Sequence, residues 1–196
     1  MIALIDADSI LYKYASIYQD VFSWDDEDIQ ITTDIVGAKM AMKDFIDSIK
    51  VATKCDEYEL VLSPMRNFRY DIEDTYKANR KAPKYNLLLK EELREYMVSS
   101  FNTYECSNIE ADDYVVLKAT ENPSNYIMCH IDKDLNQASG KHYNYNSQEK
   151  YKVTEEDGDF FFYQQVLEGD SVDNIKGCPN IGRVKALRLL TSTTPD

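Results

Sequence analysis

Short apolar runs alternate with amphipathic segments along most of the chain. Four runs are typical of short buried strands, and these are IALID at 2–6, YELVLS at 58–63, NTYEC at 102–106 and NYIMCHID at 125–132. Apolar residues recur at helical spacing in five segments, which start near Ser9, after an N-cap at Thr33, and at residues 86, 109 and 154. This alternation predicts an α/β fold with a central, mainly parallel sheet and helices on both faces.

The pattern also predicts which sides of the first helices face the core, and where the regular structure is interrupted. The expected buried positions are Ile10, Leu11, Tyr14 and Ile17 in the first helix, and Val36, Met40, Phe45, Ile46 and Ile49 in the second. Residues 23–33, SWDDEDIQITT, are expected to be an acidic connector, and HYNYN and KYKVT a small hairpin around SQE. The basic, aromatic segment that ends at Tyr85 lacks periodicity and is long enough to indicate a function.

Composition narrows the class of protein. The chain has 196 residues, of which 43% are apolar, so one compact domain is expected. No apolar run approaches the roughly 18 residues that cross a bilayer, and the four cysteines form no CxxC pair. We therefore expect a monomeric cytoplasmic protein with reduced thiols and no membrane partner.

Charge is unevenly distributed. The net charge of −13 argues against a general nucleic-acid coat. Residues 66–84 nevertheless hold six basic residues against three acidic ones, and residues 176–188 hold four basic residues and no acidic one. These two basic islands indicate local contacts with an anionic partner.

Acidic residues gather at the predicted strand ends and helix starts. They form four groups, namely Asp6 and Asp8; Glu110, Asp112 and Asp113; Asp132 and Asp134; and Asp170 and Asp173. The carboxyl ends of parallel strands meet at one edge of a sheet, so these groups are expected to converge there. Close carboxylates need compensating cations, and oxygen-only ligands favour Mg²⁺ or Mn²⁺. Two such ions could act on a phosphodiester, although each group alone could simply cap a helix or turn.

Five ordered blocks in the chain resemble those of structure-specific 5′ nucleases. They are LIDADSILYKYA, TYKANRK, IEADD, IDKDLNQ and GDSVDNIKGCPNIG. The chain is similar to the 5′-3′ exonuclease and flap endonuclease superfamily, which includes the 5′ nuclease domain of DNA polymerase I and the 5′-3′ exonucleases of tailed bacteriophages. The resemblance implies a PIN-like nuclease core in residues 1–168. It also implies a nuclease that acts on DNA or on RNA primers, either as a phage protein in the host cytoplasm or in the bacterial cytoplasm.

The resemblance also implies roles for individual residues. The nine carboxylates of the four acidic groups would hold two Mg²⁺ or Mn²⁺ ions, Asp8 being absent from many relatives. Lys77 and Arg80 would contact the scissile or the adjacent phosphate as catalytic residues, and Tyr76 would stack on a terminal base. Arg69 and Lys81, from the same basic segment, are further expected DNA contacts.

Residues 169–196 resemble the start of a helix-three-turn-helix motif that binds duplex DNA. In that interpretation Gly177 and Gly182 let the backbone approach phosphates, and Ile181 opens the second helix. Lys185 and Arg188 would add positive charge on that helix, and a K⁺ ion would bind at the turn. The implied partner is double-stranded DNA with a 5′ end, nick or flap, or an RNA–DNA hybrid.

Departures from the family pattern keep other hypotheses open. Ser63 and Pro64 stand where relatives carry another aspartate after the second strand, so Asp8 could fill that place or the site could be impaired. A protein that binds duplexes without cleaving them is therefore one alternative. Another is a haloacid-dehalogenase-like phosphatase with Asp6 as nucleophile and Asp8 as general acid, because LIDADS resembles its DxD loop.

Overall fold

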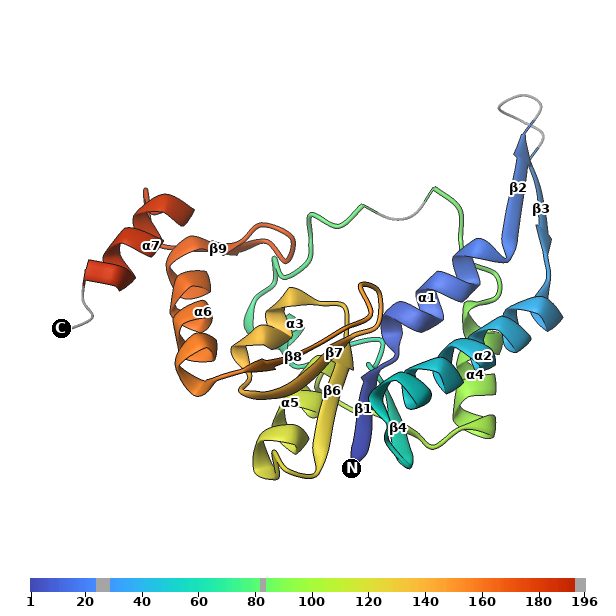
Figure 1. The fold of residues 1–196 in the computed structure, drawn as a ribbon. Coiled ribbons are helices and arrows are strands. Elements are labelled where there is room, and N and C mark those ends of the chain that lie inside the picture. Colours follow the sequence, from blue (N-terminus) through green and yellow to red (C-terminus); the bar gives the residue numbers. More distant parts are fainter. Residues whose placement is uncertain (24–28, 82–83, 193–196) are drawn as a thin grey trace.

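A computed structural model describes residues 1–23, 29–81 and 84–192, and within these ranges a six-stranded sheet forms the centre of the molecule (Figure 1). The strand order is β5-β4-β1-β6-β7-β8. The strands are β1 (Ile2–Asp6), β4 (Glu57–Leu62), β5 (Thr103–Glu105), β6 (Tyr126–His130), β7 (Gly140–Asn144) and β8 (Glu149–Val153). All neighbours are parallel except β7 and β8, which form the predicted hairpin. The prediction of a mainly parallel sheet is confirmed.

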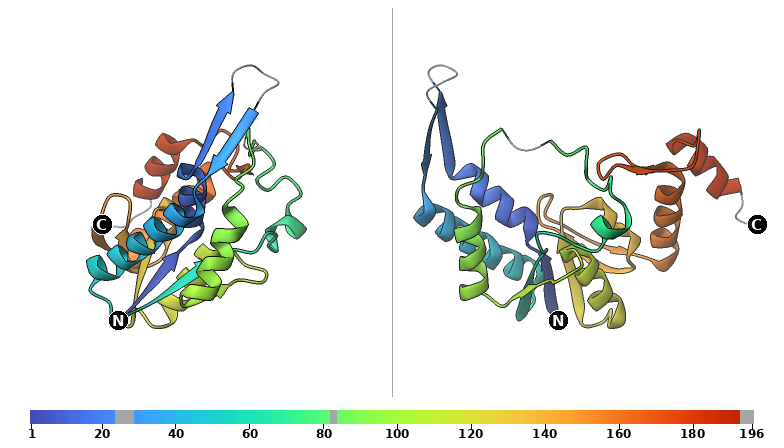
Figure 2. Two further views of the ribbon diagram at one scale, coloured as in Figure 1. Left: turned by 90° about the vertical axis from the view of Figure 1, so that its right-hand side faces the viewer. Right: turned by 180° about the vertical axis from the view of Figure 1, so that it is seen from behind.

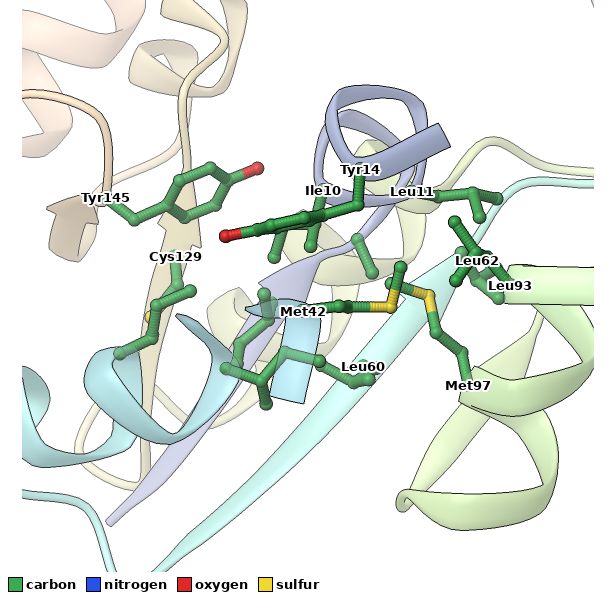
Figure 3. Packing of buried hydrophobic residues seen from close by; sticks show 14 of the residues in the cluster. Ile10, Leu11, Tyr14, Met42, Leu60, Leu62, Leu93, Met97, Cys129 and Tyr145 are labelled. Carbon is green, nitrogen blue, oxygen red and sulfur yellow. The ribbon is translucent and has the colours of Figure 1, made fainter. Parts of the chain in front are cut away.

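Helices cover both faces of this sheet, as predicted. Helices α1 (Asp8–Ile17), α2 (Ile35–Thr53) and α4 (Lys90–Ser100) pack on one face, and α5 (Ala111–Glu121) packs on the other. Alternation along β1 sends Ile5 into the first core cluster and Leu4 into the second. Figure 3 shows Met42 of α2, Met97 of α4 and Leu60 of β4 meeting in the larger cluster.

The segment after the sheet lies at one end of the molecule. It consists of α6 (Glu155–Glu168), the short strands β9 (Gly169–Asp170) and β10 (Ile175–Lys176), and α7 (Arg183–Ser192). Helix α6 begins at Thr154, whose Oγ1 accepts a hydrogen bond from the Asp157 amide at 3.1 Å. It packs closely on the 3₁₀ helix η1 (Lys133–Gln137) at Gly158. A Cβ at this position would lie 2.5 Å from the Gln137 carbonyl oxygen, so only glycine fits there.

The prediction that residues 23–33 form an acidic connector was wrong for the residues that the structure describes. Strands β2 (Gln19–Ser23) and β3 (Ile29–Thr33) form an antiparallel ribbon, and residues 24–28 lie outside the described ranges. The ribbon projects from the end of the molecule opposite α7 (Figures 1 and 2). The side chain of Gln19 ties its base to the chain before α4, donating to the Asn86 carbonyl at 3.0 Å and accepting from the Leu88 amide at 2.8 Å.

Two details of the predicted helices also need correction. Helix α2 is capped by Asp34, which accepts from the Gly37 amide at 2.9 Å, and not by Thr33. Val36 and Met40 are exposed, and so is Ile17 at the end of α1. The buried side of α2 is formed by Ala38, Met42, Ile46 and Ile49. Apolar residues occur on two sides of this helix, and packing on the sheet selected one of them.

No described helix combines the length and the apolar character that crossing a membrane requires.

Candidate active site

The carboxyl end of β1 places Asp6 at the centre of the acidic edge. Only 7% of Asp6 is exposed. Its pKa is raised well above the usual value, first by burial and then by the charges of Asp8, Asp112 and Asp132. These carboxylates come from β1, α1, α5 and the end of β6, so three of the four predicted groups lie within electrostatic reach of one another.

Ser63 links the start of α1 to the start of α5. Its amide donates to the Asp8 carboxylate, at 3.1 Å to Oδ1, and its Oγ accepts from the Ala111 amide at 2.8 Å. The hydroxyl therefore satisfies one of the unpaired amides in the first turn of α5. In the sequence Ser63 stands out only as the position of a missing acid, and no pattern there indicates this linking role.

Two further carboxylates have raised pKa values. Burial, followed by the charges of Asp113 and Glu110, raises the pKa of Asp112 to about 6. Burial and then Asp132 raise the pKa of Asp134, although a hydrogen bond from Gln165 at 2.6 Å opposes the shift. Asp132 also caps η1 by accepting from the Asp134 amide at 2.9 Å, so the capping interpretation is confirmed for Asp132.

Glu110 and Asp113 are instead paired with cations of the basic segment. Lys77 Nζ lies 2.6 Å from Glu110 Oε1, and the Arg69 guanidinium donates two hydrogen bonds to Asp113, at 2.6 and 2.7 Å. Burial would raise the pKa of Asp113, but the hydrogen bonds from Arg69 and from the Glu110 amide lower it overall. This half of the acidic edge is compensated within the protein.

The fourth acidic group meets the same basic segment. Arg80 forms an ion pair with Asp173, and the Lys77 amide donates to the Asp173 carbonyl at 3.0 Å. Two asparagines complete the contact, because the Asn79 side chain donates to the Ser171 carbonyl at 2.6 Å and that of Asn174 to the Thr75 carbonyl at 2.8 Å. The TYKANRK block thus docks on the GDSVDN block, almost a hundred residues away in the chain.

Tyr76 has surroundings that differ from those that stacking on a base requires. It is 4% exposed, and its hydroxyl lies 2.8 Å from Glu110 Oε2 and 3.2 Å from Asp173 Oδ2. Its ring packs edge to face against Tyr70, with the centroids 5.3 Å apart. A buried ring offers no free face to a base, so in this structure Tyr76 bridges two acidic groups.

An open cleft of about 770 Å³ is lined by members of three of the four acidic groups. The carboxylates that line it are Glu110, Asp112, Asp113, Asp134, Asp170 and Asp173, together with Asp159. Helices α5 and α6 supply an apolar part that includes Leu117, Phe162 and Val166. Arg69 and Tyr76 also line the cleft, whereas Lys81 lies on the exposed part of the basic segment.

The donor chemistry of this edge suits a hard divalent cation, because every candidate ligand is a carboxylate oxygen. Across residues 1–23, 29–81 and 84–192, however, no three His, Cys, Asp or Glu side chains are grouped closely enough to hold a metal ion. The nine predicted carboxylates do not form such a group, and three of them are paired with Arg69, Lys77 and Arg80. Their assignment as metal ligands stays a prediction.

The second basic island lies apart from this cleft. Helix α7 starts at Arg183, and Lys185 and Arg188 are exposed and line a shallow hollow of about 480 Å³ that Ile181 also borders. Gly182 has open space around it, as an approach to a partner requires. Gly177 differs, because a Cβ there would lie 2.2 Å from the Glu168 carbonyl carbon. Packing inside the chain therefore requires a glycine at position 177, and its phosphate contact stays a prediction.

Together, the sheet and its edge define an α/β protein with an acidic site at the carboxyl ends of parallel strands. No protein-family model matches the chain. It is 33% identical to DNA polymerase I of Rhizobium leguminosarum over 142 residues, which are 64% of this chain and 14% of the polymerase. The chain thus corresponds to a small part of that relative.

Solved structures resemble nearly the whole chain. A bacteriophage T5 flap endonuclease in a complex with DNA and metal ions aligns with 97% of this chain and 74% of its own, at 15% identity and a TM-score of 0.72. The T5 5′-exonuclease with bound zinc gives 16% identity, the same coverages and a TM-score of 0.68. The catalytic core of Rad2 with a DNA substrate gives 14% identity over 97% of this chain and 61% of its own, with a TM-score of 0.56.

The chain therefore has the fold of the bacteriophage T5 flap endonuclease and 5′-exonuclease, as the resemblance seen in the sequence implied.

Proposed function

We propose that this chain is a divalent-metal-dependent 5′ nuclease that hydrolyses phosphodiester bonds near the 5′ ends of DNA. The observation that carries the proposal is the contact of the basic segment with two distant acidic groups, in which Lys77 pairs with Glu110 and Arg80 with Asp173. A phosphodiester bound there would meet carboxylates and cations together. Similarity to a DNA polymerase and to nucleases solved with DNA supports the same activity.

The carboxylates would hold the metal ions and the basic segment would hold the phosphate. The proposed ligands of two Mg²⁺ or Mn²⁺ ions are the nine carboxylates of the four acidic groups, namely Asp6, Asp8, Glu110, Asp112, Asp113, Asp132, Asp134, Asp170 and Asp173. Such ions activate water and stabilise the leaving oxygen of a phosphodiester. Lys77 and Arg80 would bind the non-bridging oxygens of the scissile phosphate and stabilise their charge.

The second basic island would hold the duplex behind the cut. Lys185 and Arg188 are exposed on α7, next to the open backbone at Gly182 and Ile181. Helix N-termini and basic side chains together favour phosphate groups. We propose that this region, with K⁺ bound at its turn, acts as a helix-three-turn-helix motif in residues 169–196. The substrates would be duplexes with a 5′ end, nick or flap, including RNA–DNA hybrids, in phage-infected or bacterial cytoplasm.

A phosphatase with Asp6 as nucleophile has less support. A covalent nucleophile must be ionised and accessible to its substrate. Asp6 is buried, and burial together with Asp8 and Asp112 raises its pKa. Such surroundings suit a carboxylate that is compensated by a cation better than one that attacks phosphorus.

The test is cleavage of a 5′-labelled duplex with a recessed or flapped end, in Mg²⁺, Mn²⁺ or chelator. We expect metal-dependent release of short 5′ products, abolished by Asp132→Asn and unaffected by Asp47→Asn, a matched change on the surface of α2. Lys185→Glu should weaken duplex binding first, whereas Asp132→Asn should leave it intact. Undiminished cleavage by Asp132→Asn would remove the central claim, and binding without cleavage in every metal would favour the catalytically impaired alternative.

A further inference from the structure

The only two histidines of the chain lie next to each other in the interior. His130 ends β6 and is 1% exposed, and His142 lies in β7 and is fully buried. His130 Nε2 is 2.8 Å from His142 Nδ1, and the rings meet edge to face with centroids 5.1 Å apart. The proposed reaction uses neither ring, so a buried polar pair of this kind needs another explanation.

The outer nitrogens of the pair reach the two ends of one segment. His130 Nδ1 lies 2.6 Å from the Asp132 carbonyl oxygen, and His142 Nε2 lies 2.9 Å from that of Ala138. Carbonyl oxygens only accept, so each of these two bonds needs a proton on the outer ring nitrogen. When both outer nitrogens carry a proton, the inner contact is a hydrogen bond only with a third proton, because the two inner nitrogens otherwise face each other as acceptors.

A third side chain holds the middle of the same segment. Tyr151 of β8 stacks on His142, with centroids 5.2 Å apart and planes 14° from parallel, and its hydroxyl donates to Asn136 Oδ1 at 2.8 Å. Segment 132–138 is thereby bonded from the sheet at its start, middle and end. Asp132 and Asp134, two of the carboxylates proposed as metal ligands, lie on this segment.

We infer that His142 and Tyr151 are positioning residues for the carboxylates of Asp132 and Asp134, acting through His130 and Asn136. The inference rests on the proposed function for what these carboxylates bind. Partners that orient metal-ligating side chains typically change metal affinity by about 10- to 100-fold when they are removed. Here the orienting bonds act on the backbone of the segment, so their loss should loosen both carboxylates together.

The experiment measures the affinity of the whole chain for Mn²⁺ without nucleic acid, by electron paramagnetic resonance of free Mn²⁺. We expect His142→Phe, which keeps the ring but loses both hydrogen bonds, to weaken binding at the Asp132–Asp134 carboxylates by about 10- to 100-fold. His142→Gln keeps a donor and should recover part of the loss. Tyr143→Phe is the control, since Tyr143 is a buried tyrosine of the same strand whose side chain lies in the core on the other face of the sheet.

A second readout separates this inference from the proposed function. Amide hydrogen exchange in residues 132–138 should be faster in His142→Phe than in the wild type and unchanged in Tyr143→Phe. If the wild type binds no Mn²⁺, the proposal of a metal site is refuted. The rate of amide hydrogen exchange in residues 132–138 then tests by itself whether His142 positions this segment.

Unchanged exchange across 132–138 in folded His142→Phe would overturn the inference, as would unchanged Mn²⁺ affinity where the wild type binds. Should His142→Phe fail to fold, Tyr151→Phe takes its place, because it removes a single hydroxyl and keeps the stacked ring. Faster exchange around Asn136 in that variant would support the inference, and unchanged exchange there would refute it.

Discussion

Asp112 and Asp113 are adjacent in the sequence, yet their carboxyl groups have opposite electrostatics. Burial and the nearby Asp113 and Glu110 raise the pKa of Asp112 to about 6, whereas Arg69 outweighs burial and lowers the pKa of Asp113. Asp112 belongs to an uncompensated half of the edge with Asp6 and Asp8. None of these three forms an ion pair within the described ranges.

The other half, formed by Glu110, Asp113 and Asp173, is paired with Arg69, Lys77 and Arg80. The difference teaches that a dense acidic edge can serve two purposes. Its paired carboxylates dock the basic segment on the sheet, and its unpaired ones have the strongest electrostatic reason to bind an added cation.

Replacing Asp112 by Asn tests the uncompensated half most severely. We expect metal-dependent cleavage of the 5′-labelled duplex to fall by on the order of 100-fold or more, because even outer partners of a metal site typically cost about 10- to 100-fold. Asp47→Asn on α2 is the matched control, measured in the same assay. Equal rates for wild type and Asp112→Asn would mean that this half is not the catalytic one.

The raised pKa of Asp112 also predicts how stability depends on pH. Its folded-state pKa, about 6, exceeds the value of roughly 3.9 in an unfolded chain. The stabilisation from its protonated form is therefore complete below pH 3.9 and is lost as pH rises through 6, by at most about 3 kcal/mol.

Urea unfolding in chelator, compared between wild type and Asp112→Asn, isolates this contribution. As the pH rises from 4 to 6, the free energy of unfolding should fall more steeply in the wild type than in the variant. Parallel pH profiles would show that Asp112 is as well solvated as an exposed carboxyl, and the contrast with Asp113 would then collapse.

Arg69→Met addresses the paired half, where the expected effect is on stability. Arg69 and Asp113 are partly buried and joined by two hydrogen bonds, so losing the arginine should cost about 1–3 kcal/mol of unfolding free energy. Arg66→Met removes the exposed pair with Asp71 and should cost no more than about 1 kcal/mol. Thermal unfolding of both variants sharpens the comparison, and equal losses would contradict it.

Much of the fold could be predicted because its signals are local. Buried runs such as IALID gave the parallel strands, and helical spacing gave the helices around them. The β2–β3 ribbon was missed, since its acidic composition resembles a connector and its pairing depends on contacts between two strands. Val36 and Met40 were misplaced because helical periodicity alone does not say which apolar side meets the sheet.

The site was predictable only in part, for the same reason. Acidic residues at strand ends predicted that Asp6, Asp112 and Asp132 would approach one another. Their partners were not predictable, because Gln165, Asn79 and Ser63 carry no distinctive pattern and become important only through their neighbours. Tyr76 was placed in the right neighbourhood with the wrong exposure.

Short-range patterns in the chain are enough to predict which residue types stand at the carboxyl edge and that strands alternate with helices. Which carboxyl is buried, which is paired, and which backbone segment the two histidines contact depend on the folded arrangement. Burial and Coulomb interactions depend on distances in space, and the groups that set them here come from β1, α5, the basic segment and residues 169–176. Folding brings together groups that are far apart in the chain, as where the Tyr145 hydroxyl donates to the Asp6 carbonyl, 139 positions away.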